Sequence, residues 1–395
     1  MIRACMVVFS HYPADPRVRR EAEALADEGT EVDVVCLAGP GAPRRETVRG
    51  VRVFRLPVTQ RRGGKLRYLW EYASFLLMAF CTVSWLHLVR RYRLVHVHNM
   101  PDVLVFTALL PRLTGAKVVL DLHDPMPEVF MTKYGLGANH PVLMLLRLLE
   151  RCSIAMANLV LTPNISFQNL FVSRGCPERK IAIVMNSPQE TVFRPAPAGD
   201  GARPGGDGRR VLMYHGTIVE RHGLDTALEA LDRLREELPG ISFQVYGDGD
   251  FVEAFQRRVG ELRLEGAVAY HGRVSLERIA AAIPAIDVGV IPNKRSVFTD
   301  LNLPTRIFEY LAMGKPVVAP RTHGVRDYFD ENSLFLFEPG DAGSLAAAIR
   351  RALAAPERER AVIERGQAVY RRHRWEVERR HFVNRLSLLA RGAPG

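Results

Sequence analysis

The sequence contains no pattern of cysteines that would hold a metal ion or a disulfide framework. Its five cysteines are scattered and odd in number, and no two of them form a CxxC motif. This distribution argues against a disulfide-stapled scaffold and against the common zinc modules, and it is typical of a protein of the reducing cytosol. The amino-terminal apolar run is too short for a signal peptide, and we expect a first β-strand there instead.

A glycine-rich GxGxxG turn is absent after this first strand, so the sequence does not predict a dinucleotide-binding site there. Basic residues outnumber acidic ones and give a net charge of +11. Such an excess can serve nucleic acid, anionic lipid or an anionic substrate. No nucleic-acid-binding motif accompanies the basic runs, and aromatic residues are not interleaved with them as stacking platforms. We therefore expect no nucleic-acid partner.

Short apolar strands alternate with helical stretches in both halves of the chain, which predicts an α/β protein with parallel sheets. The 395 residues are enough for two domains. A stretch rich in proline and glycine, residues 194–208, cannot hold regular structure and separates the two halves. We expect a first domain over 1–190, a linker over 191–210, a second domain over 211–370, and a final segment over 371–395 that belongs to one long helix from about Pro356 to Ala390.

The stretch from Leu303 to Ala319 predicts a short helix followed at once by a buried strand. Pro304 suits the first helical turn, because its missing N–H is not needed there, and Gly314 is placed to end the helix. A helix start offers free N–H groups and a positive dipole end to an anion. Glu309, one turn further on, can accept hydrogen bonds from a pair of sugar hydroxyls, so the geometry suits a nucleotide sugar. The alternative is a core helix whose glutamate is merely solvated at its edge.

This stretch resembles the carboxy-terminal signature of glycosyltransferase family 4, whose members are retaining enzymes of the GT-B fold. Other segments follow in the same order and at similar spacings, so the resemblance covers nearly the whole chain. It implies two Rossmann-like domains that face each other across a cleft, with the acceptor bound by the first and a nucleoside diphosphate sugar by the second. It also implies that the terminal helix crosses back to the first domain, and that no metal cofactor is needed.

The resemblance implies donor-binding residues after the first strand of the second half. Residues 214–224 resemble the family's glycine loop, with Gly216 at its start. The family usually places Arg after this glycine and Lys before the next one, where this chain has Thr217 and His222. We therefore assign the diphosphate to Arg221, because a guanidinium can bind phosphate with two parallel hydrogen bonds. The alternative is an exposed loop arginine.

Two loops are expected to complete the nucleotide side of the donor site. Gly247 lies in a glycine turn after the next strand, and the backbone of Arg273 and Val274 resembles the loop that contacts the base. Asp248 and Asp250 match the metal-binding Asp-x-Asp of another glycosyltransferase fold. We regard this match as coincidental, because it follows a strand in what resembles a GT-B nucleotide domain.

The family signature opens with a glutamate that this chain lacks. Counting back from Glu309, that glutamate would fall at Leu301. Some members share this absence and carry a cation just before the second glutamate, as Arg306 does here. The expected residues of this segment in the donor site are Leu303, Pro304, Thr305, Arg306 and Glu309.

Polar residues at the ends of two neighbouring strands of the first half are expected to meet the acceptor, because open α/β sheets bind ligands at the carboxyl ends of their strands. A histidine on a strand is usually structural, but several polar residues at adjacent strand ends favour a site. The segment from Ser10 to Ala22 resembles a loop variant of polysaccharide-assembly members. The expected acceptor-side residues are Asp15, Arg17, His98, Asn99, His123 and Asp124. The expected catalytic residues are His123, Asp124, Arg221 and Glu309.

The apolar stretch from Tyr68 to Val89 lies between two basic runs, 61–67 and 90–93. Its uninterrupted apolar core, 72–86, has 15 residues, fewer than the roughly 20 that span a bilayer. Three alternatives stay open: a buried core helix, a helix in the bilayer interface anchored by its two tryptophans, and a transmembrane helix. The basic flanks favour anionic lipid, so we expect a cytoplasmic protein, peripheral at the inner membrane face, with a polyprenyl-linked saccharide as acceptor.

Two other functions are compatible with the sequence. One is a GT-B nucleotide-sugar epimerase, which would release its sugar without an acceptor. The other is a non-catalytic subunit that binds nucleotide sugar, which the missing glutamate at Leu301 allows. The favoured function is sugar transfer in exopolysaccharide or O-antigen assembly, and the sequence does not specify the sugar, the base or the linkage.

Overall fold

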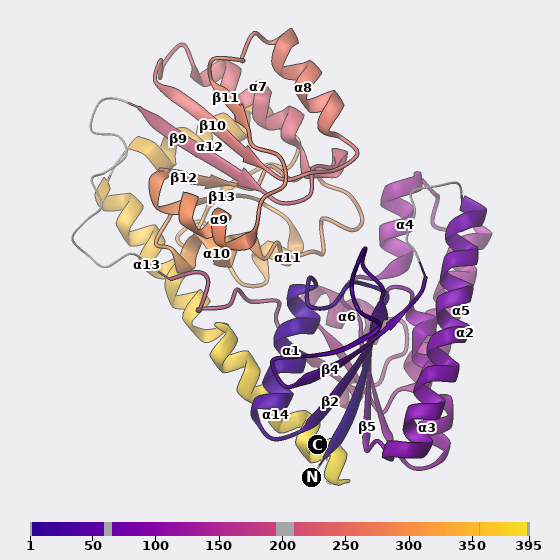
Figure 1. Ribbon diagram of the computed structural model, residues 1–395. Coiled ribbons are helices and arrows are strands. Elements are labelled where there is room, and N and C mark those ends of the chain that lie inside the picture. Colours follow the sequence, from indigo (N-terminus) through magenta and orange to yellow (C-terminus); the bar gives the residue numbers. More distant parts are fainter. Residues whose placement is uncertain (1, 59–64, 195–208, 355, 393–395) are drawn as a thin grey trace. The chain divides into compact units, whose positions relative to one another are not determined.

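The computed structural model describes residues 2–58, 65–194, 209–354 and 356–392, which form two compact units. The first unit comprises Met1–Asn186 and Val377–Gly395, and the second comprises Ser187–Glu376. Each unit contains one sheet covered by helices (Figure 1). Most of the expected linker and part of the first basic run lie outside the described residues.

The first sheet is parallel except at one edge. Its strand order is β3-β4-β2-β1-β5-β6-β7-β8, and only the β3–β4 pair is antiparallel. The order reverses between β1 and β5, so the loops after these strands meet there. The strands are β1 (Arg3–Val7), β2 (Glu31–Leu37), β3 (Arg45–Val48), β4 (Val51–Leu56), β5 (Leu94–His98), β6 (Lys117–Asp121), β7 (Leu159–Thr162) and β8 (Ile181–Ile183).

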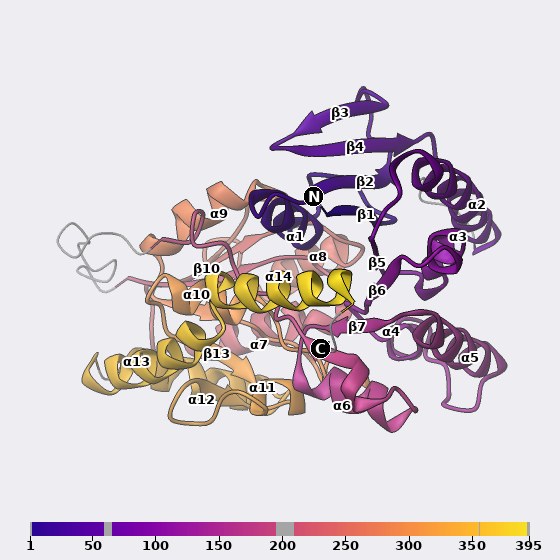
Figure 2. The ribbon, with the colours of Figure 1, turned by 90° about the horizontal axis from the view of Figure 1, so that it is seen from below.

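Helices cover both faces of the first sheet. Figures 1 and 2 show α1 and α14 on one face, and α2 and α3 on the other. The α-helices of this unit are α1 (Pro16–Asp27), α2 (Lys65–Arg90), α3 (Leu109–Leu113), α4 (Met126–Tyr134), α5 (Pro141–Met156), α6 (Ile165–Ser173) and most of α14 (Trp375–Arg391). Two short 3₁₀ helices, η1 (Asp102–Ala108) and η2 (Glu178–Lys180), complete it.

The second sheet is parallel throughout, in the order β11-β10-β9-β12-β13-β14. This is the doubly wound arrangement, whose order reverses between β9 and β12, and such a reversal opens a crevice for ligands at the carboxyl ends of the strands. The strands are β9 (Arg210–His215), β10 (Ile241–Tyr246), β11 (Val268–Tyr270), β12 (Val288–Val290), β13 (Val317–Pro320) and β14 (Phe335–Phe337).

The helices of the second unit bury one continuous apolar core. Leu228 and Leu231 of α7 pack with Leu345 and Ile349 of α12 over the inner strands, all at 1% exposure or less. The helices are η3 (Glu220–His222), α7 (Leu224–Leu234), α8 (Val252–Glu261), α9 (Leu276–Ala282), η4 (Ile283–Ala285), α10 (Arg306–Ala312), α11 (His323–Arg326), α12 (Ala342–Ala354) and α13 (Pro356–Arg372).

The final helix differs from the prediction. Instead of one helix from about Pro356 to Ala390, the chain forms α13 and α14 with a break at residues 373 and 374. The break falls where the chain leaves the second unit for the first. Within the first unit, Glu378 accepts a hydrogen bond from the amide of Met185 at 3.0 Å, and Phe382 is fully buried against the His96 ring.

Helix α2 has two apolar faces of different kinds. Phe75, Ala79, Val83 and Leu86 are buried at 0–3% exposure and pack against the first sheet and η1. The opposite face leaves large side chains more than half exposed, namely Trp70, Leu77, Trp85, Leu88 and Val89. By length and composition Trp70–Arg90 could cross a membrane, but a core helix can pass the same test. The buried face shows that α2 also serves as a core helix.

Candidate active site

The glycine loops after β9 and β10 touch backbone to backbone. A Cβ atom at Gly247 would lie 1.8 Å from the carbonyl oxygen of Gly216. Both glycines also have positive φ, 126° at Gly216 and 141° at Gly247, which disfavours any larger residue. The amide of Gly247 in turn donates to the carbonyl of Gly272 at 2.8 Å, so the predicted base-contacting loop joins the same assembly. In that loop Arg273 is exposed and Val274 is partly buried.

Arg306 joins the start of α10 to the end of β9. Its Nη1 donates to the carbonyl of His215 at 2.8 Å, and its guanidinium lies 4.6 Å from the centre of the Tyr214 ring. A Cβ atom at Gly216 would lie only 2.8 Å from the same nitrogen. The absence of a side chain at Gly216 therefore allows the cation to reach the glycine loop. This is the cation that the sequence placed just before the second glutamate.

Glu309 lies one turn further along α10, beside a buried histidine. Its Oε2 is 3.2 Å from Nε2 of His215, and the carboxylate is largely buried at 9% residue exposure. Burial, and then the charge of Arg306, lowers the pKa of His215 to about 3. His215 is therefore neutral near pH 7. The Glu309 carboxylate thus faces a neutral imidazole ring.

Arg221 supplies a second cation on the same side of the sheet. It lies in η3, with its guanidinium 5.7 Å from the centre of the Phe298 ring, and its buried Nε has no hydrogen-bond partner among the described residues. His222 stands at the position of the family's lysine, and its Nδ1 donates to the carbonyl oxygen of Thr217 at 2.7 Å. Burial lowers the pKa of His222 to about 3. His222 therefore carries no charge near neutral pH, and its role here is to hold the loop.

The start of α10 lies two residues later than Pro304, where the prediction placed the first turn. The helix begins at Arg306 with Thr305 as its N-cap, so Pro304 precedes the helix and does not lie in its first turn. The amide of Asn302 is bonded to Phe298 O at 3.1 Å. Within the described chain, no hydrogen bond is found for the amides of Leu303, Thr305 and Arg306. Pro304 has no amide hydrogen, and three donors thus remain for an anion.

Two residues after β12 were not predicted from the sequence. Asn293 is buried at 1% exposure, and its Oδ1 has no hydrogen-bond partner among the described residues. Lys294 pairs with Asp225 at 2.5 Å. Both follow β12, whose neighbour β9 carries the glycine loop, and so they lie where the strand order reverses. The residues Ile-Pro-Asn-Lys after this three-residue strand match no motif, but their position at the end of a strand could have indicated a binding site.

The first unit holds a buried polar cluster centred on Asp121. Arg17 donates to both carboxylate oxygens, from Nε at 2.9 Å and from Nη2 at 2.8 Å. The same carboxylate lies 3.2 Å from His123 Nε2 and 3.4 Å from His98 Nδ1, and these two ring nitrogens are 3.1 Å apart. His98 is fully buried, whereas the His123 side chain is 22% exposed. The cluster thus presents one histidine to solvent.

The charge state of this cluster follows from burial and from Arg17. Burial would raise the pKa of Asp121, but Arg17, and then His123, outweigh it and hold that pKa well below its ordinary value. Burial, followed by the neighbouring His96, lowers the pKa of His98 well below its ordinary value. Burial also raises the pKa of Glu21, against the pull of Arg17. An ionised Asp121 with neutral buried histidines is therefore the state near pH 7.

The remaining acceptor-side residues shape the loops around this cluster. Asp15 caps α1 by accepting from the amides of Arg17 and Val18. The Asn99 amide donates to Asp124 O at 2.8 Å, and its oxygen accepts from the His123 amide at 2.8 Å. Asn99 therefore fixes the two strand ends relative to each other. The structure brings together the predicted residues after β5 and β6, and it places Arg17 inside the unit.

Four side chains of this cluster could in principle hold a metal ion. The ligand atoms of Glu21, His96, His98 and Asp121 lie within 4.8 Å of one another. However, the guanidinium of Arg17 already occupies both oxygens of Asp121 and lies 3.2 Å from Glu21. A divalent ion would have to displace this buried cation, so these residues do not fit a metal site.

Comparison with known proteins connects this arrangement to a family. Residues 14–187 match the model of the glycosyl transferase 4-like domain, and residues 209–355 match that of glycosyl transferases group 1. The first unit thus carries a glycosyl transferase 4-like domain and the second a glycosyl transferases group 1 domain. The two matched domains together cover most of the chain and leave the segment between them, 188–208, unmatched.

Relatives and solved structures agree with this assignment. A putative colanic acid biosynthesis glycosyltransferase, WcaL, of Escherichia coli is 26% identical over 174 residues, which are 44% of this chain and 42% of WcaL. The chain spans less than half the length of the first curated relatives that it matches. A sucrose-phosphate synthase of Thermosynechococcus elongatus has 20% identity and a TM-score of 0.81 over the whole of both chains.

A second solved structure, Anabaena HepE in complex with UDP and glucose, has a TM-score of 0.72 and 18% identity, covering 98% of this chain and 100% of HepE. At such identities the likeness concerns the fold alone. The expected GT-B fold, with two Rossmann-like domains, is thereby confirmed. The two matched domain models and the colanic acid relative confirm the resemblance to bacterial polysaccharide-assembly glycosyltransferases.

Proposed function

We propose that this glycosyltransferase transfers a sugar from a nucleoside diphosphate sugar to a hydroxyl acceptor, with retention of anomeric configuration. The observation that carries the proposal is the arrangement at the carboxyl edge of the second sheet. Arg306 donates to the carbonyl of His215, Arg221 lies in η3 after the glycine loop that follows β9, and the Glu309 carboxylate lies 3.2 Å from the neutral His215 ring. Two cations and free amides suit a diphosphate, and a carboxylate suits sugar hydroxyls.

In the proposed reaction, the bond between the anomeric carbon and the phosphate oxygen breaks, and its electron pair leaves with the diphosphate. The acceptor oxygen bonds to the anomeric carbon on the same face and gives its proton to the departing phosphate. The transition state is expected to resemble an oxocarbenium ion. Arg221, Arg306 and the free amides before α10 would stabilise the growing negative charge, and no step needs a metal. Preorganised donors of this kind are each worth on the order of 10²–10³ in kcat.

The first unit is proposed to bind the acceptor at the ends of β5 and β6. His123 is the part of the Asp121 cluster that solvent reaches, and Asp124 follows it directly. Asp121 lies within 3.2 Å of His123 and can fix its tautomer and orientation. These loops are held in place by the side chains of Asp15, Arg17, His98 and Asn99. In this assignment His123 and Asp124 orient the acceptor hydroxyl.

We propose a polyprenyl-linked saccharide as acceptor, in the assembly of a bacterial cell-surface polysaccharide. The colanic acid relative supports the pathway class. The outward stripe of α2 is its exposed apolar face, which comprises Trp70, Leu77, Trp85, Leu88 and Val89. This stripe supports attachment to a lipid surface, because tryptophans and basic flanks are typical of helices in the bilayer interface. Helix α5 adds a second outward stripe with Met144, Leu145 and Leu148 all more than half exposed. The protein would then work in the cytoplasm, at the inner face of the membrane.

Product analysis tests this proposal. The protein is incubated with UDP-, GDP-, ADP- and dTDP-sugars and with a polyprenyl-linked saccharide, and the anomeric configuration of the new linkage is read by NMR. An axial donor should give an axial product. An inverted product would reject retention, and a free or epimerised sugar formed without acceptor would favour the epimerase.

One observation favours a second candidate, a non-catalytic subunit that binds nucleotide sugar. Leu301 stands where the family's first glutamate would be. In that case the protein would bind a nucleotide sugar but would not transfer the sugar to any acceptor. A variant with Leu301→Glu that gains transfer activity, when the parent has none, would support this candidate.

A further inference from the structure

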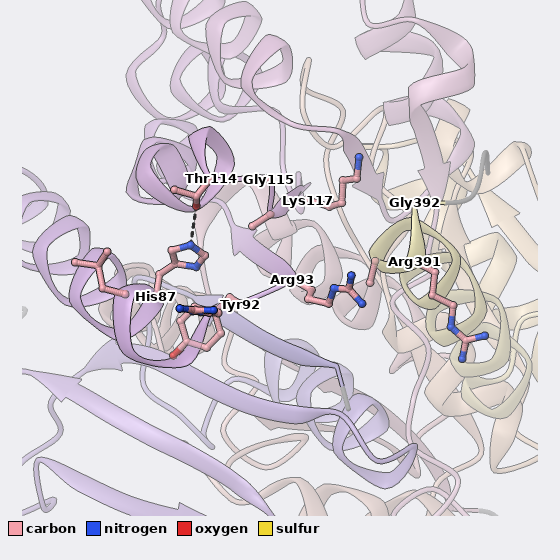
Figure 3. Close-up of a pocket in the computed structure, with 12 residues that line it drawn as sticks. His87, Tyr92, Arg93, Thr114, Gly115, Lys117, Arg391 and Gly392 are labelled. Atoms are coloured by element: carbon pink, nitrogen blue, oxygen red, sulfur yellow. Dashed lines mark hydrogen bonds between the residues drawn. The ribbon is translucent and has the colours of Figure 1, made fainter.

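A basic cavity lies in the first unit, at the opposite edge of the sheet from the residues assigned to the acceptor. It has a volume of about 620 Å³ and is bounded by the ends of α2 and α14, the loop after α3, and the starts of β5 and β6 (Figure 3). His98 ends the strand that Leu94 begins, so the edges are roughly 13 Å apart at 3.3 Å per residue. The cavity is therefore separate from the Asp121 cluster.

The lining of this cavity carries four cations and no acidic side chain among the described residues. In Figure 3, Arg93 extends between Tyr92 and Arg391, and Lys117 lies on the adjacent strand. Among the residues that the structure describes, none of the four cations forms an ion pair or a side-chain hydrogen bond. The acidic groups of β2, Glu31 and Asp33, are paired with other arginines. The cations of the cavity are Arg91, Arg93, Lys117 and Arg391.

These charges could merely complement the helix ends that meet here. Helices α2, α3 and α14 all end at the cavity, and a helix C-terminus carries about half a negative charge. Three such ends amount to about −1.5, against four full positive charges. The excess is therefore positive. His87 and Thr114 join two of the helix ends through a 2.7 Å hydrogen bond, which holds the lining in place.

The rim of the cavity is apolar. Leu88, which lines the cavity, is 66% exposed and belongs to the outward stripe of α2 with Trp85 and Val89. Leu113, next to the lining residue Thr114, is 75% exposed. Apolar side chains beside a cationic hollow suit a ligand that has both hydrocarbon chains and a phosphate.

We propose that this cavity binds the phosphate group of an anionic phospholipid whose acyl chains lie along the outward stripe of α2. The inference rests on the proposed attachment to a membrane and not on the proposed transfer reaction. It adds to that attachment a specific preference for anionic lipid and a fixed point at the carboxyl end of α2. A flat, non-specific charge interaction would show neither saturation by monomeric lipid nor dependence on these four residues.

The test compares two double variants of the full chain that lose the same charge. Arg93→Gln/Lys117→Gln removes two cations of the cavity. Arg147→Gln/Arg151→Gln removes two cations of α5, on the other apolar helix. Binding is measured with monomeric dihexanoyl phosphatidylglycerol by thermal shift, and with phosphatidylcholine vesicles, with and without phosphatidylglycerol, by co-sedimentation.

We expect saturable binding of the monomeric lipid by the parent protein and by the α5 variant, and its loss in the cavity variant. On vesicles that contain phosphatidylglycerol, the cavity variant should bind about 25-fold more weakly, since each cation near an anionic surface contributes about fivefold. Equal losses in both double variants would overturn the inference in favour of non-specific attraction. Saturation by soluble glycerol 1-phosphate at the same concentrations would overturn the lipid assignment.

The two proposals fail in different ways. Sugar transfer with no preference for anionic vesicles would remove the headgroup site and leave the reaction intact. Lipid binding by the cavity, with no transfer from any nucleotide sugar, would do the reverse. Both variants keep every residue assigned to the donor and the acceptor, so their transfer to a water-soluble acceptor should equal that of the parent.

Discussion

Acidification should destabilise the second unit, because His215 is buried there in its neutral form. The pKa of His215 falls to about 3 through burial and then through Arg306, whereas the unfolded chain has a value of about 6.5. The unfolded state therefore binds a proton first. The stability that this group contributes is complete above pH 6.5 and is lost as the pH falls toward 3.

The size of the effect follows from the two pKa values. At about 1.36 kcal/mol per pH unit, linkage predicts a loss of about 2 kcal/mol between pH 7 and pH 5, and about 5 kcal/mol at most. For a unit of this size, 2 kcal/mol lowers Tm by about 4–8 °C. His215→Gln should remove that part of the pH dependence, whatever its effect on Tm at neutral pH. The exposed His381→Gln is the matched control.

Thermal melting followed by calorimetry between pH 5 and pH 7 gives the slope of Tm against pH for each protein. The slope should be shallower for His215→Gln than for the parent, and unchanged for His381→Gln. If His215→Gln keeps the full slope of the parent, then His215 is not held neutral by burial. The neutral state assigned to His215, beside Glu309, would then be wrong.

Three further changes test the packing and the proposed roles. Gly289→Ala should destabilise the protein by about 1–3 kcal/mol, because the new Cβ would lie 2.3 Å from a buried tyrosine ring; Gly137→Ala, with open space around it, is the neutral control in the same melts. Arg174→Met should lower the free energy of unfolding by about 3–5 kcal/mol, because it leaves the buried Glu128 and Glu150 unpaired. Denaturant titration should show that adding Glu150→Gln restores part of this stability. Asp121→Asn should lower kcat and shift its pH profile with little change in donor KM; an unchanged profile would show that this carboxylate does not position His123.

The arrangement of the residues expected at the donor site was largely predictable from the sequence, because these residues lie close together along short loops. Gly216 and Gly247 each follow a strand directly, and their backbone contact explains why both had to be glycine. Arg306 and Glu309 share one short helix, so their spacing alone places them on the same side. The exception is Pro304, since a prolyl residue fits before a helix as well as within its first turn.

The polar cluster of the first unit was only partly predictable. His98 and His123 were expected at neighbouring strand ends, but Asp121, the residue that connects them, was not among the expected site residues. Its partner Arg17 is 104 positions away in the chain, and nothing local indicates that pairing. Similarly, the outward stripe of α5 has the spacing of an ordinary amphipathic helix, and only its exposure in the folded unit distinguishes it.

The most direct test of the central claim, that the second unit binds a nucleoside diphosphate sugar at Glu309, is a titration by thermal shift with UDP, GDP, ADP and dTDP and their sugars. Parent, Glu309→Ala and the exposed control Glu253→Ala are compared. One nucleotide sugar should stabilise the parent and the control by about 2.7 kcal/mol at a hundred times its Kd, and should shift Glu309→Ala far less. If no nucleotide shifts the melting of the folded parent, or if Glu309→Ala responds like the control, the claim is contradicted.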